Sequence, residues 1–530
     1  MTHAPFLGLR GKKLVYAITF TCSLGFLLFG YDNGVFSGLT TAPLFLNQFD
    51  NPGASMLGFI IAVYELGCLL GALICAVYAD HFGRIKVMVA GNIILIIGCV
   101  IQTASFGRPE LIVGRVVTGV GMGFITSVVP IWQAECTLAH SRGRMIAVQL
   151  SMLIVGIVIA YWLDYGCSFA TTSLQWRFPI IFQVVFAVAM IGLCCMLPES
   201  PRWLAARGRN DEALAILGAL RDGSEDDVHV RAEYDEILAS LALEQEESGS
   251  WKDVFSDNGI KGYQRTIIAC AVQAMQEFTG TNIITYYAPY VMVHSVGLDN
   301  HQALLLSGGL QLFFLAMSFI PWAIIDKAGR RKLFMFGSTG MGACMLASGL
   351  CIYRGGRNNG IGAVVALYLF QGFFTVGWMS NMWCYPSEIL PLRLRQRGGA
   401  LSVVWQWLIT FLVVEITPPA ISNIGWWTYI IFSLLNFGSI GIVWYWFPET
   451  AGRSLESVDL LFVGAKNIRE VVLRSTGKAE TPVFDMKGAG VELRHRVLGK
   501  GDEEDEMYIG KQDVVHVERV VGTGPGGVAV

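Results

Sequence analysis

Long stretches without a single charged residue are the feature that most constrains this chain. Such windows, each about 20 residues or longer, are Val87–Phe106, Phe178–Leu197, Ala303–Ile325, Leu333–Tyr353 and Asn358–Ser387. A helix of about 20 residues crosses a hydrocarbon layer of about 30 Å. Only 15% of the 530 residues are charged, whereas an ordinary soluble domain has about 25%. The sequence therefore predicts a multi-pass membrane protein in a lipid bilayer and excludes most soluble enzymes.

Twelve candidate spans can be placed along the chain. They begin near Leu14, Met56, Val87, Glu110, Met145, Phe178, Arg265, Gln302, Lys332, Ile361, Gly398 and Gly425. The polar segment 198–262, with amphipathic helical patterns around Asp211–Arg221 and Asp227–Glu247, divides the spans six and six. We expect an all-α membrane protein with two six-helix halves, at 1–197 and 263–447, joined by a linker at 198–262 that contains short cytoplasmic helices. The tail, 448–530, is expected to be largely disordered.

Basic residues gather in one set of alternate loops. That set contains Arg10, Lys12, Lys13, Arg84, Lys86, Arg142, Arg144, Lys327, Arg330, Arg331, Lys332, Arg393, Arg395 and Arg397, and the other set contains Arg108, Arg177, Arg354 and Arg357. Since positively charged loops tend to stay in the cytoplasm, both termini and the linker are expected there. The net charge of −3 gives no reason to expect nucleic acid. No nucleotide-binding, metal or catalytic motif is evident, so we expect neither an enzyme nor a cofactor.

Three short patterns recur about 250 residues later in the same order. Asp80 with Arg84 recurs as Asp326 with Arg330, Glu135 with Arg142 recurs as Glu388 with Arg395, and Pro198-Glu199 recurs as Pro448-Glu449. Two six-span halves repeated in one orientation indicate a parallel duplication about an axis along the membrane normal. A protein of this kind is expected to bind its substrate between the halves.

Seven segments resemble the sugar porters of the major facilitator superfamily, in the style of fungal hexose and pentose transporters. They are FGYDNGVFSG (29–38), GRVVTGVGMG (114–123), PESPRW (198–203), MQEFTGTNIITYY (275–287), DKAGRRK (326–332), WCYPSEI (383–389) and PETAGRSLE (448–456). Their order and positions cover nearly the whole membrane region. The resemblance implies the major facilitator fold with twelve helices, alternating access, and transport of a monosaccharide, often with a proton.

Few ionisable residues lie well inside the spans, where a charge is costly. Arg115 is the basic one, and Asp32, Glu65 and Glu277 are the acidic ones. At 1.5 Å per residue, Asp32 and Arg115 each lie roughly 10 Å below the outer boundary, so they can meet. A change in their separation would change the proton affinity of the carboxyl group. In proton symporters that this chain resembles, the matching Asp accepts the proton and the matching Arg is its partner.

Asp32 and Glu65 each leave an alternative role open. Some facilitators of the family also keep the Asp, and a static ion pair between Asp32 and Arg115 could simply hold two helices together. Glu65 is equally compatible with a transport role and with a carboxyl group that faces the bundle interior beside a hydroxyl or backbone partner.

Sugar binding requires donors and acceptors for hydroxyl groups beside an aromatic face. Gln276 and Glu277 share a helix face in the seventh span, with Asn282 about one turn beyond. The resemblance implies that these three residues line the sugar pocket and that Trp383 stacks on the sugar. Gln406 stands where the family usually has Asn. Trp383 could instead pack within the bundle or at the membrane interface.

Two further positions depart from the family pattern. Glu277 stands where Gln is usual, so it either accepts hydrogen bonds from hydroxyl groups or titrates. Leu150 aligns with a pocket Gln of the family, while Gln149 lies about 100° away around the helix. Gly280 and Gly377 are expected to allow a helix break or a close backbone approach.

Charged residues at the cytoplasmic helix ends form a candidate gate, which the resemblance also implies. They are Asp80, Arg84, Glu135, Arg142, Asp326, Arg330, Glu388 and Arg395. Paired acids and guanidinium groups can close in one state and separate in the other, which biases a two-state equilibrium. Contact with lipid headgroups would explain the basic residues but not their paired acids.

The leading hypothesis is a secondary transporter that imports a monosaccharide by proton symport across the plasma membrane. The alternatives are an uncoupled sugar facilitator, a carrier of a polyol or a quinate-like acid, and a transporter-like nutrient sensor.

Overall fold

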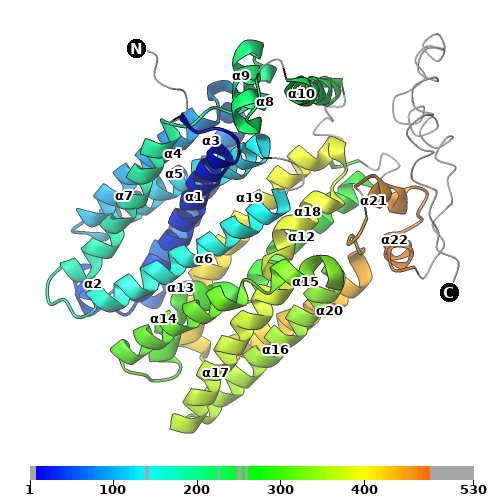
Figure 1. Cartoon of the computed structure of the whole chain (residues 1–530). Helices are drawn as coiled ribbons and strands as arrows, with labels where there is room; N and C mark the ends of the chain where they lie inside the picture. Colours follow the sequence, from blue (N-terminus) through cyan, green and yellow to red (C-terminus); the bar gives the residue numbers. More distant parts are fainter. Residues whose placement is uncertain are drawn as a thin grey trace, which may run out of the picture. The chain divides into compact units, whose positions relative to one another are not determined.

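The computed structural model describes residues 8–137, 142–224, 227–246, 254–256, 261–453 and 455–477, and every regular element in these ranges is a helix (Figure 1). We name as the first half the helices α1 (Gly11–Leu39), α3 (Ala54–Phe82), α4 (Arg84–Thr103), α5 (Arg108–Cys136), α6 (Arg142–Cys167) and α7 (Leu174–Cys194), together with the short α2 (Pro43–Gln48). The second half consists of α12 (Gly262–Phe278), α13 (Thr281–His294), α14 (Asn300–Met317), α15 (Pro321–Ala328), α16 (Arg330–Arg354), α17 (Arg357–Phe374), η3 (Thr375–Met379), α18 (Asn381–Ile389), α19 (Leu392–Ile424) and α20 (Trp427–Trp446).

Ten helical segments of the described chain are long and apolar enough to cross a membrane. The two remaining spans are each divided into two shorter helices. The seventh is α12 followed by α13, and the eighth is α14 followed by α15, whose first residue is Pro321. A count of long continuous helices therefore omits the seventh and eighth spans. With these two included, the predicted twelve-helix all-α fold is confirmed.

Glycine explains two of the places where the backbone departs from a regular helix in the second half. Gly280 has a φ of +89° at the break between α12 and α13, a conformation that favours a residue without a Cβ. A Cβ on Gly377 in η3 would lie 2.5 Å from the Cα of Gly337 in α16, so these two backbones touch. Both expectations for Gly280 and Gly377 are confirmed.

The helix packing repeats between the halves. The pairs α1–α6, α4–α5 and α4–α7 of the first half correspond to α12–α19, α16–α17 and α16–α20 of the second half. The halves meet along three helix pairs, α3 with α19, α6 with α14 and α1 with α13. This arrangement places the first, second, fifth, seventh, eighth and eleventh spans around the boundary between the halves.

The outer faces of the helices are apolar. On α3, for example, Leu70, Leu73, Ile74 and Val77 are 49%, 46%, 42% and 68% exposed, and their spacing places them on one face. A stripe of exposed aliphatic side chains at this spacing is typical of a helix that faces lipid rather than water. The packing thus agrees with a multi-pass membrane protein.

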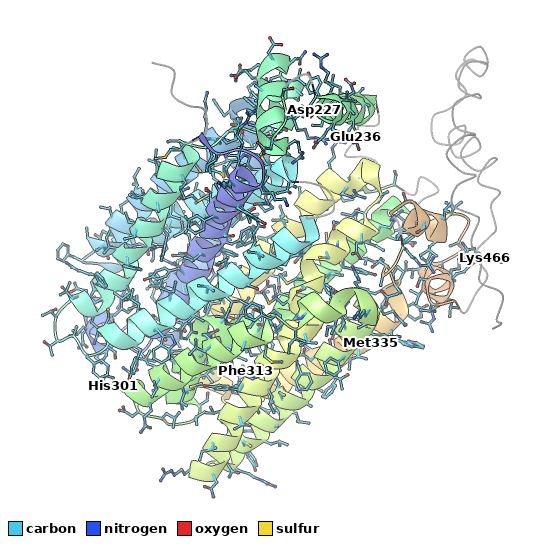
Figure 2. The ribbon with its side chains drawn as sticks, viewed as in Figure 1. Asp227, Glu236, His301, Phe313, Met335 and Lys466 are labelled. Carbon is cyan, nitrogen blue, oxygen red and sulfur yellow. The ribbon has the colours of Figure 1, made fainter. Side chains whose placement is uncertain are left out.

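The bundle has two distinguishable ends. The linker helices α8 (Pro201–Ala206), α9 (Asn210–Arg221) and α10 (Val228–Glu246) lie at one end, which we call the linker end. Asp227 and Glu236 mark this end in Figure 2, and His301 marks the opposite end, which we call the far end. Helices α9 and α10 occupy the two segments with amphipathic patterns.

The tail begins with ordered structure. Helices α21 (Leu455–Phe462) and α22 (Ile468–Ser475) follow α20, and Asp459 of α21 accepts a hydrogen bond from the buried Arg265 at the start of α12. The tail is therefore folded as far as Gly477, and the part of it expected to be disordered after that residue lies outside the described residues.

Candidate functional site

A central cavity of about 670 Å³, including the part open to solvent, lies between the halves. All five predicted substrate-binding residues line it, namely Gln276, Glu277, Asn282, Trp383 and Gln406. They come from α12, α13, α18 and α19 of the second half. Trp383 lines this cavity as a half-buried side chain; the alternatives for it were packing within the bundle and a place at the membrane interface.

The first half contributes a mostly apolar wall with a few polar groups. Leu150 lines the cavity where the family pattern has Gln, and Gln149 is not among the lining residues. Phe29, Asn33 and Glu65 face the cavity from α1 and α3. Most of the polar recognition groups therefore belong to the second half.

Six buried polar atoms of the cavity-lining side chains have no hydrogen-bond partner among the described residues. They are Asn33 Oδ1, Glu65 Oε2, Gln276 Oε1, Thr281 Oγ1, Gln406 Oε1 and Trp407 Nε1. Buried polar groups are nearly always hydrogen-bonded in folded proteins. A set of unpartnered donors and acceptors around one cavity is therefore suited to a ligand that carries several hydroxyl groups.

The break in the seventh span arranges two of these residues. Because Gly280 ends α12 and begins α13, Asn282 turns back toward Glu277, and Asn282 Nδ2 donates a hydrogen bond to Glu277 Oε2. Thr279 and Asn436 secure the break, since Asn436 Nδ2 donates to the Thr279 carbonyl at 2.8 Å. The carboxylate of Glu277 is thus held at the cavity by its own helix pair.

Glu65 is joined to the opposite half. The hydroxyl of Tyr286 in α13 donates to Glu65 Oε1 in α3 at 2.6 Å, and both side chains are buried. The sequence left a hydroxyl partner open as one possibility for Glu65, and this hydrogen bond provides it. Because the partner lies on the other half, the bond also connects the two sides of the cavity.

Asp32 and Arg115 form a completely buried pair. Arg115 Nη1 lies 3.4 Å from Asp32 Oδ2, and both side chains have an exposure of 0%. Arg115 also donates to the carbonyl of Ile61 at 2.8 Å and stacks between Phe36 and Tyr64, at 4.1 and 4.5 Å from the ring centroids. The predicted meeting of α1 and α5 at these two residues is present in the structure, and Asp32 Oδ1 has no described hydrogen-bond partner.

The candidate gate forms two similar clusters at the linker end. In the first half Arg84 binds Glu135 at 2.9 Å and Asp80 at 2.8 Å. In the second half Arg330 binds Glu388 at 2.9 Å, and Thr450 Oγ1 donates to Glu388 at 2.6 Å. These described pairs each remain within one half.

The other three predicted gate residues lie near the ends of three different helices. Arg142 begins α6, Asp326 lies in α15 and Arg395 lies in the first turn of α19. The side chains of Arg142 and Asp326 lie outside the described part of the chain.

The repeated Pro-Glu pairs have a structural role that the sequence did not reveal. Glu199 accepts hydrogen bonds from the backbone N–H groups of Arg84 and Ile85, at 3.0 and 3.1 Å. Glu449 accepts from those of Arg330 and Arg331, at 2.9 and 3.1 Å. Each glutamate therefore caps the first turn of α4 or α16 and holds it beside the gate.

Burial affects the first of these capping glutamates. It raises the pKa of Glu199 above its ordinary value, while the backbone N–H groups of Ser200, Ile85 and Arg84 act against that rise. The only sequence signal for this role was the recurrence of the Pro-Glu pair about 250 residues later in the chain. That recurrence did not show which helix each glutamate would cap.

The halves are closed against each other at the far end. Tyr161 of α6 donates to the carbonyl of Thr285 in α13 at 2.7 Å, and Ser168 Oγ lies 3.2 Å from His301 Nδ1 of α14. The described gate pairs at the linker end do not cross between halves. Polar contacts between the halves therefore close the far end and reach the cavity at Tyr286, and Ser151 Oγ also lies 3.4 Å from Ser318 Oγ in the part of α6 that is nearer the linker end.

The sequence profile described as "Sugar (and other) transporter" matches residues 18–462, most of the chain. The chain belongs to this sugar transporter family. The family is one of transporters rather than enzymes. Its members include the sugar transporter STL1 of Saccharomyces cerevisiae, which is 36% identical to this chain over 86% of this sequence and 83% of its own.

Other relatives and solved structures agree with this family assignment. The high-affinity glucose transporter of Kluyveromyces lactis is 29% identical over 85% of each chain. The partially occluded, inward-open form of the xylose transporter XylE from E. coli has a TM-score of 0.71 at 25% identity, covering 83% of this sugar transporter and 99% of XylE. XylE bound to 6-bromo-6-deoxy-D-glucose, described as a proton:xylose symporter, has a TM-score of 0.70 at 26% identity, covering 85% and 99%.

Several cavity groups of this sugar transporter were not selected from the sequence. Asn33, Thr281, Thr285, Tyr286 and Thr410 line the cavity but were not predicted. Thr281, Thr285 and Tyr286 lie within the segment MQEFTGTNIITYY that carried the resemblance, so helical spacing from Gln276 could have indicated them. Asn33 lies within FGYDNGVFSG, which also carried the resemblance, and Thr410 lies one helical turn beyond the predicted Gln406.

Proposed function

We propose that this protein imports a monosaccharide, a hexose or a pentose, by proton symport with alternating access. The observation that carries the sugar part is the central cavity with its six unpartnered polar atoms, because a pyranose supplies hydroxyl groups for them. The half-buried Trp383 provides an aromatic surface for the apolar face of the ring.

The buried Asp32–Arg115 pair supports proton coupling. A carboxylate in hydrocarbon is costly unless it is paired or protonated, so Asp32 can exchange Arg115 for a proton. The similar structure of XylE, a proton:xylose symporter, supports the same mechanism. The alternative is an uncoupled facilitator in which this pair only holds α1 to α5.

The halves, α1–α7 and α12–α20, are proposed as the two bodies that rock about the cavity. The closed far end and the described gate pairs that remain within each half fit a state open toward the linker end. The excess of basic residues at the linker end supports a cytoplasmic location for that end and for both termini, in the plasma membrane.

The charge of the cavity favours a neutral substrate over an acid. Glu65 and Glu277 line it, and neither Lys nor Arg is among its lining residues. A quinate-like acid would place its carboxylate beside two carboxyl groups without a cation. A polyol has the same hydroxyl groups as a sugar and no charge, so it is the second candidate that the cavity supports.

The decisive experiment is uptake of labelled hexoses, pentoses, polyols and quinate in a transport-deficient cell, with and without a protonophore. We expect at least one labelled monosaccharide to accumulate in the cell against its concentration gradient. This accumulation should collapse when the protonophore is added. Uptake that is unaffected by the protonophore would assign an uncoupled facilitator. Uptake of only a polyol or only quinate would refute the proposed substrate class.

A further inference from the structure

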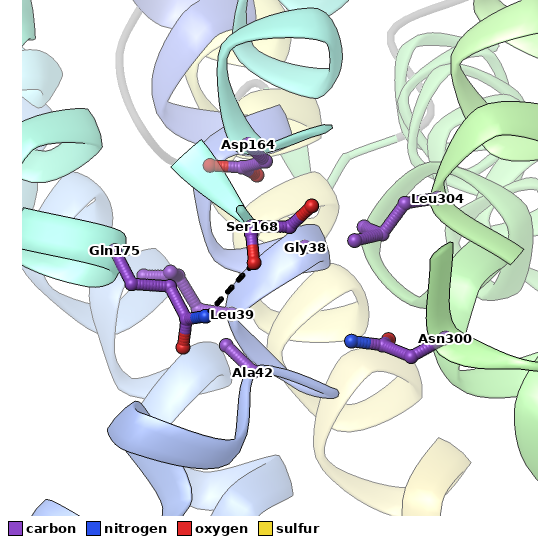
Figure 3. A pocket seen from close by; sticks show the side chains of 8 residues that line it. All are labelled: Gly38, Leu39, Ala42, Asp164, Ser168, Gln175, Asn300 and Leu304. Carbon is purple, nitrogen blue, oxygen red and sulfur yellow. Dashed lines mark hydrogen bonds between the residues drawn. The ribbon is translucent and has the colours of Figure 1, made fainter. Parts of the chain in front are cut away.

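Asp164 lies near the far end of α6, where this helix of the first half meets α14 of the second half. Its side chain is only 4% exposed, and neither carboxyl oxygen has a hydrogen-bond partner among the described residues. Together with Gly38, Ser168, Gln175 and Asn300 it lines a small pocket, whose empty space is about 220 Å³ including the part open to solvent (Figure 3). A buried carboxylate without a partner is costly, so the group requires a proton or a cation in this state.

The position of Asp164 on α6 places it within the closed contact between the halves. Tyr161, three residues earlier, donates to the Thr285 carbonyl at 2.7 Å. Ser168, four residues later, lies 3.2 Å from His301 Nδ1. Residues at these spacings share one helix face. Asp164 therefore lies on the face of α6 that closes the far end, with a contact between the halves on each side.

The opposite wall of the pocket supplies a second unpartnered oxygen. Asn300 and Leu304 point into the pocket from α14 (Figure 3), and Asn300 Oδ1 is buried without a hydrogen-bond partner in the described chain. An ionised carboxylate can only accept hydrogen bonds, whereas a protonated one donates. One proton on Asp164 thus adds a donor at the carboxyl group itself, beside the amide and hydroxyl donors of Asn300, Gln175 and Ser168.

The surroundings of Asp164 offer little positive charge. The pocket-lining residues include neither Lys nor Arg. Arg177 on α7 stacks instead on Phe106 and Trp176, at 5.1 and 4.9 Å. Gly38 of α1 lies directly against the carboxyl group, so that a Cβ on this glycine would clash with Asp164 Oδ2. The remaining titratable groups around this pocket are Tyr31 on α1, Tyr161 and Cys167 on α6, and Asp299 and His301 at the start of α14.

We propose that Asp164 is a second proton-binding site, which takes up a proton from the far side when the halves close there. The inference rests on the proposed function, because it requires the halves to open at the far end. When they open, water reaches the carboxyl group, the O–H bond breaks and the proton returns to the same side. Asp164 therefore controls closure and carries no proton across the membrane, a task proposed for Asp32.

The sign of the pH dependence follows from this exchange. Closing binds one proton, so a lower pH on the far side favours the closed form. Where the open form is ionised and the closed form protonated, the ratio of closed to open molecules changes by up to tenfold per pH unit.

The test measures closure directly, in the full-length chain in lipid nanodiscs. Nitroxide labels are placed at the exposed far-end residues Thr172 and Gln302 through a non-canonical amino acid, so that the native cysteines remain unlabelled. The labelled protein carries Asp32→Asn, with and without Asp164→Asn, because Asp32→Asn removes the other proposed proton site. We expect the short-distance population to rise as pH falls, by up to tenfold in ratio per unit, and Asp164→Asn to abolish this rise.

Two results would overturn the proposal. One is an unchanged pH dependence in Asp164→Asn. The other is a dependence on Na⁺ at constant pH that Asp164→Asn removes, because this would assign a metal cation to the pocket. The natural sequence, which retains Asp32, is assayed for proton-coupled sugar uptake in parallel. If that uptake is absent while the Asp164-dependent distance change persists, the proposal for Asp164 is retained. Only the proposed proton coupling of sugar uptake is then refuted.

A measurement on the natural sequence avoids the question of whether the variant folds. Infrared difference spectra of the closed form at neutral pH should contain the carbonyl band of a protonated aspartic acid, and this band should vanish when the far end is opened. Its absence from the closed form would overturn the proposal.

Discussion

The hydrogen bond between Tyr286 and Glu65 gives the sharpest test of how the two halves are held together. Tyr286→Phe removes only the hydroxyl that donates to Glu65 Oε1 at 2.6 Å. Glu65 Oε2 already has no described partner, so the substitution leaves the whole buried carboxyl group without a hydrogen bond. The lost hydrogen bond destabilises the state in which the halves meet at Glu65. It does not destabilise a state in which water can hydrogen-bond to the Glu65 carboxyl group.

The expected magnitude follows from the type of bond. A hydrogen bond to a charged group contributes about 1.5–3 kcal/mol, and each 1.4 kcal/mol changes an equilibrium about tenfold. Tyr286→Phe should therefore shift the conformational equilibrium roughly ten- to a hundredfold away from the closed far end.

The neighbouring residue provides a matched control. Tyr287 is also fully buried, but its hydroxyl donates at 2.9 Å to the carbonyl of Val414, which belongs to the same half. Tyr287→Phe should lower the free energy of unfolding by about 0.5–1.5 kcal/mol and leave the far-end equilibrium unchanged.

Both variants are compared by the distance between labels at Thr172 and Gln302 and by thermal unfolding. An equal shift of the distance distribution in the two variants, or no shift in Tyr286→Phe, would refute the assignment of this bond as a link between the halves.

Three further predictions concern the coupling pair, the cavity and the helix caps. Asp32→Asn should abolish sugar-driven proton uptake in proteoliposomes while sugar exchange persists, because the buried proton acceptor is lost; unaltered sugar accumulation would count against coupling at this residue. Gln276→Ala and Trp383→Ala should each raise the sugar concentration for half-maximal uptake about five- to tenfold, since each loses about 1 kcal/mol of contact; unchanged affinity in both would place the sugar elsewhere. Glu199→Ala and Glu449→Ala should each lower the free energy of unfolding by about 0.5–2 kcal/mol, and their effects should add in the double variant because the capped helices lie in different halves; a single variant with full stability would contradict the capping role.

Much of the architecture could be predicted because hydrocarbon imposes strict rules. Uncharged windows located the spans, and the cost of isolated charges suggested that Asp32 and Arg115 would meet, which they do at 3.4 Å. Helical spacing also grouped Gln276, Glu277 and Asn282, which line one cavity. Each of these inferences depends on distance along a single helix or on burial of a charge, and both can be read from a sequence.

Contacts between distant segments could not be predicted in the same way. Asp164 lies near the end of the fifth candidate span, and its burial depends partly on α14, which comes from the other half. Glu199 caps α4, and Glu449 caps α16, over more than a hundred residues of chain. A pattern identifies which residues are unusual, but the partner depends on how helices far apart in the sequence are packed.

The location of the two buried aspartates has a consequence for coupling. Asp32, Arg115 and Ile61, whose carbonyl fixes Arg115, all belong to the first half. A rigid rotation of one half against the other would therefore leave their separation unchanged. Release of Arg115 by a proton on Asp32 requires α1 to move relative to α5, and α1 also contacts α13, the helix that carries Asn282 and Tyr286. Asp164 lies at the boundary itself, so rigid rotation alone changes its contact with water. The coupling proposed at Asp32 would thus depend on substrate contacts that reach α1 through α13, whereas the closure proposed at Asp164 would respond to the rotation without them.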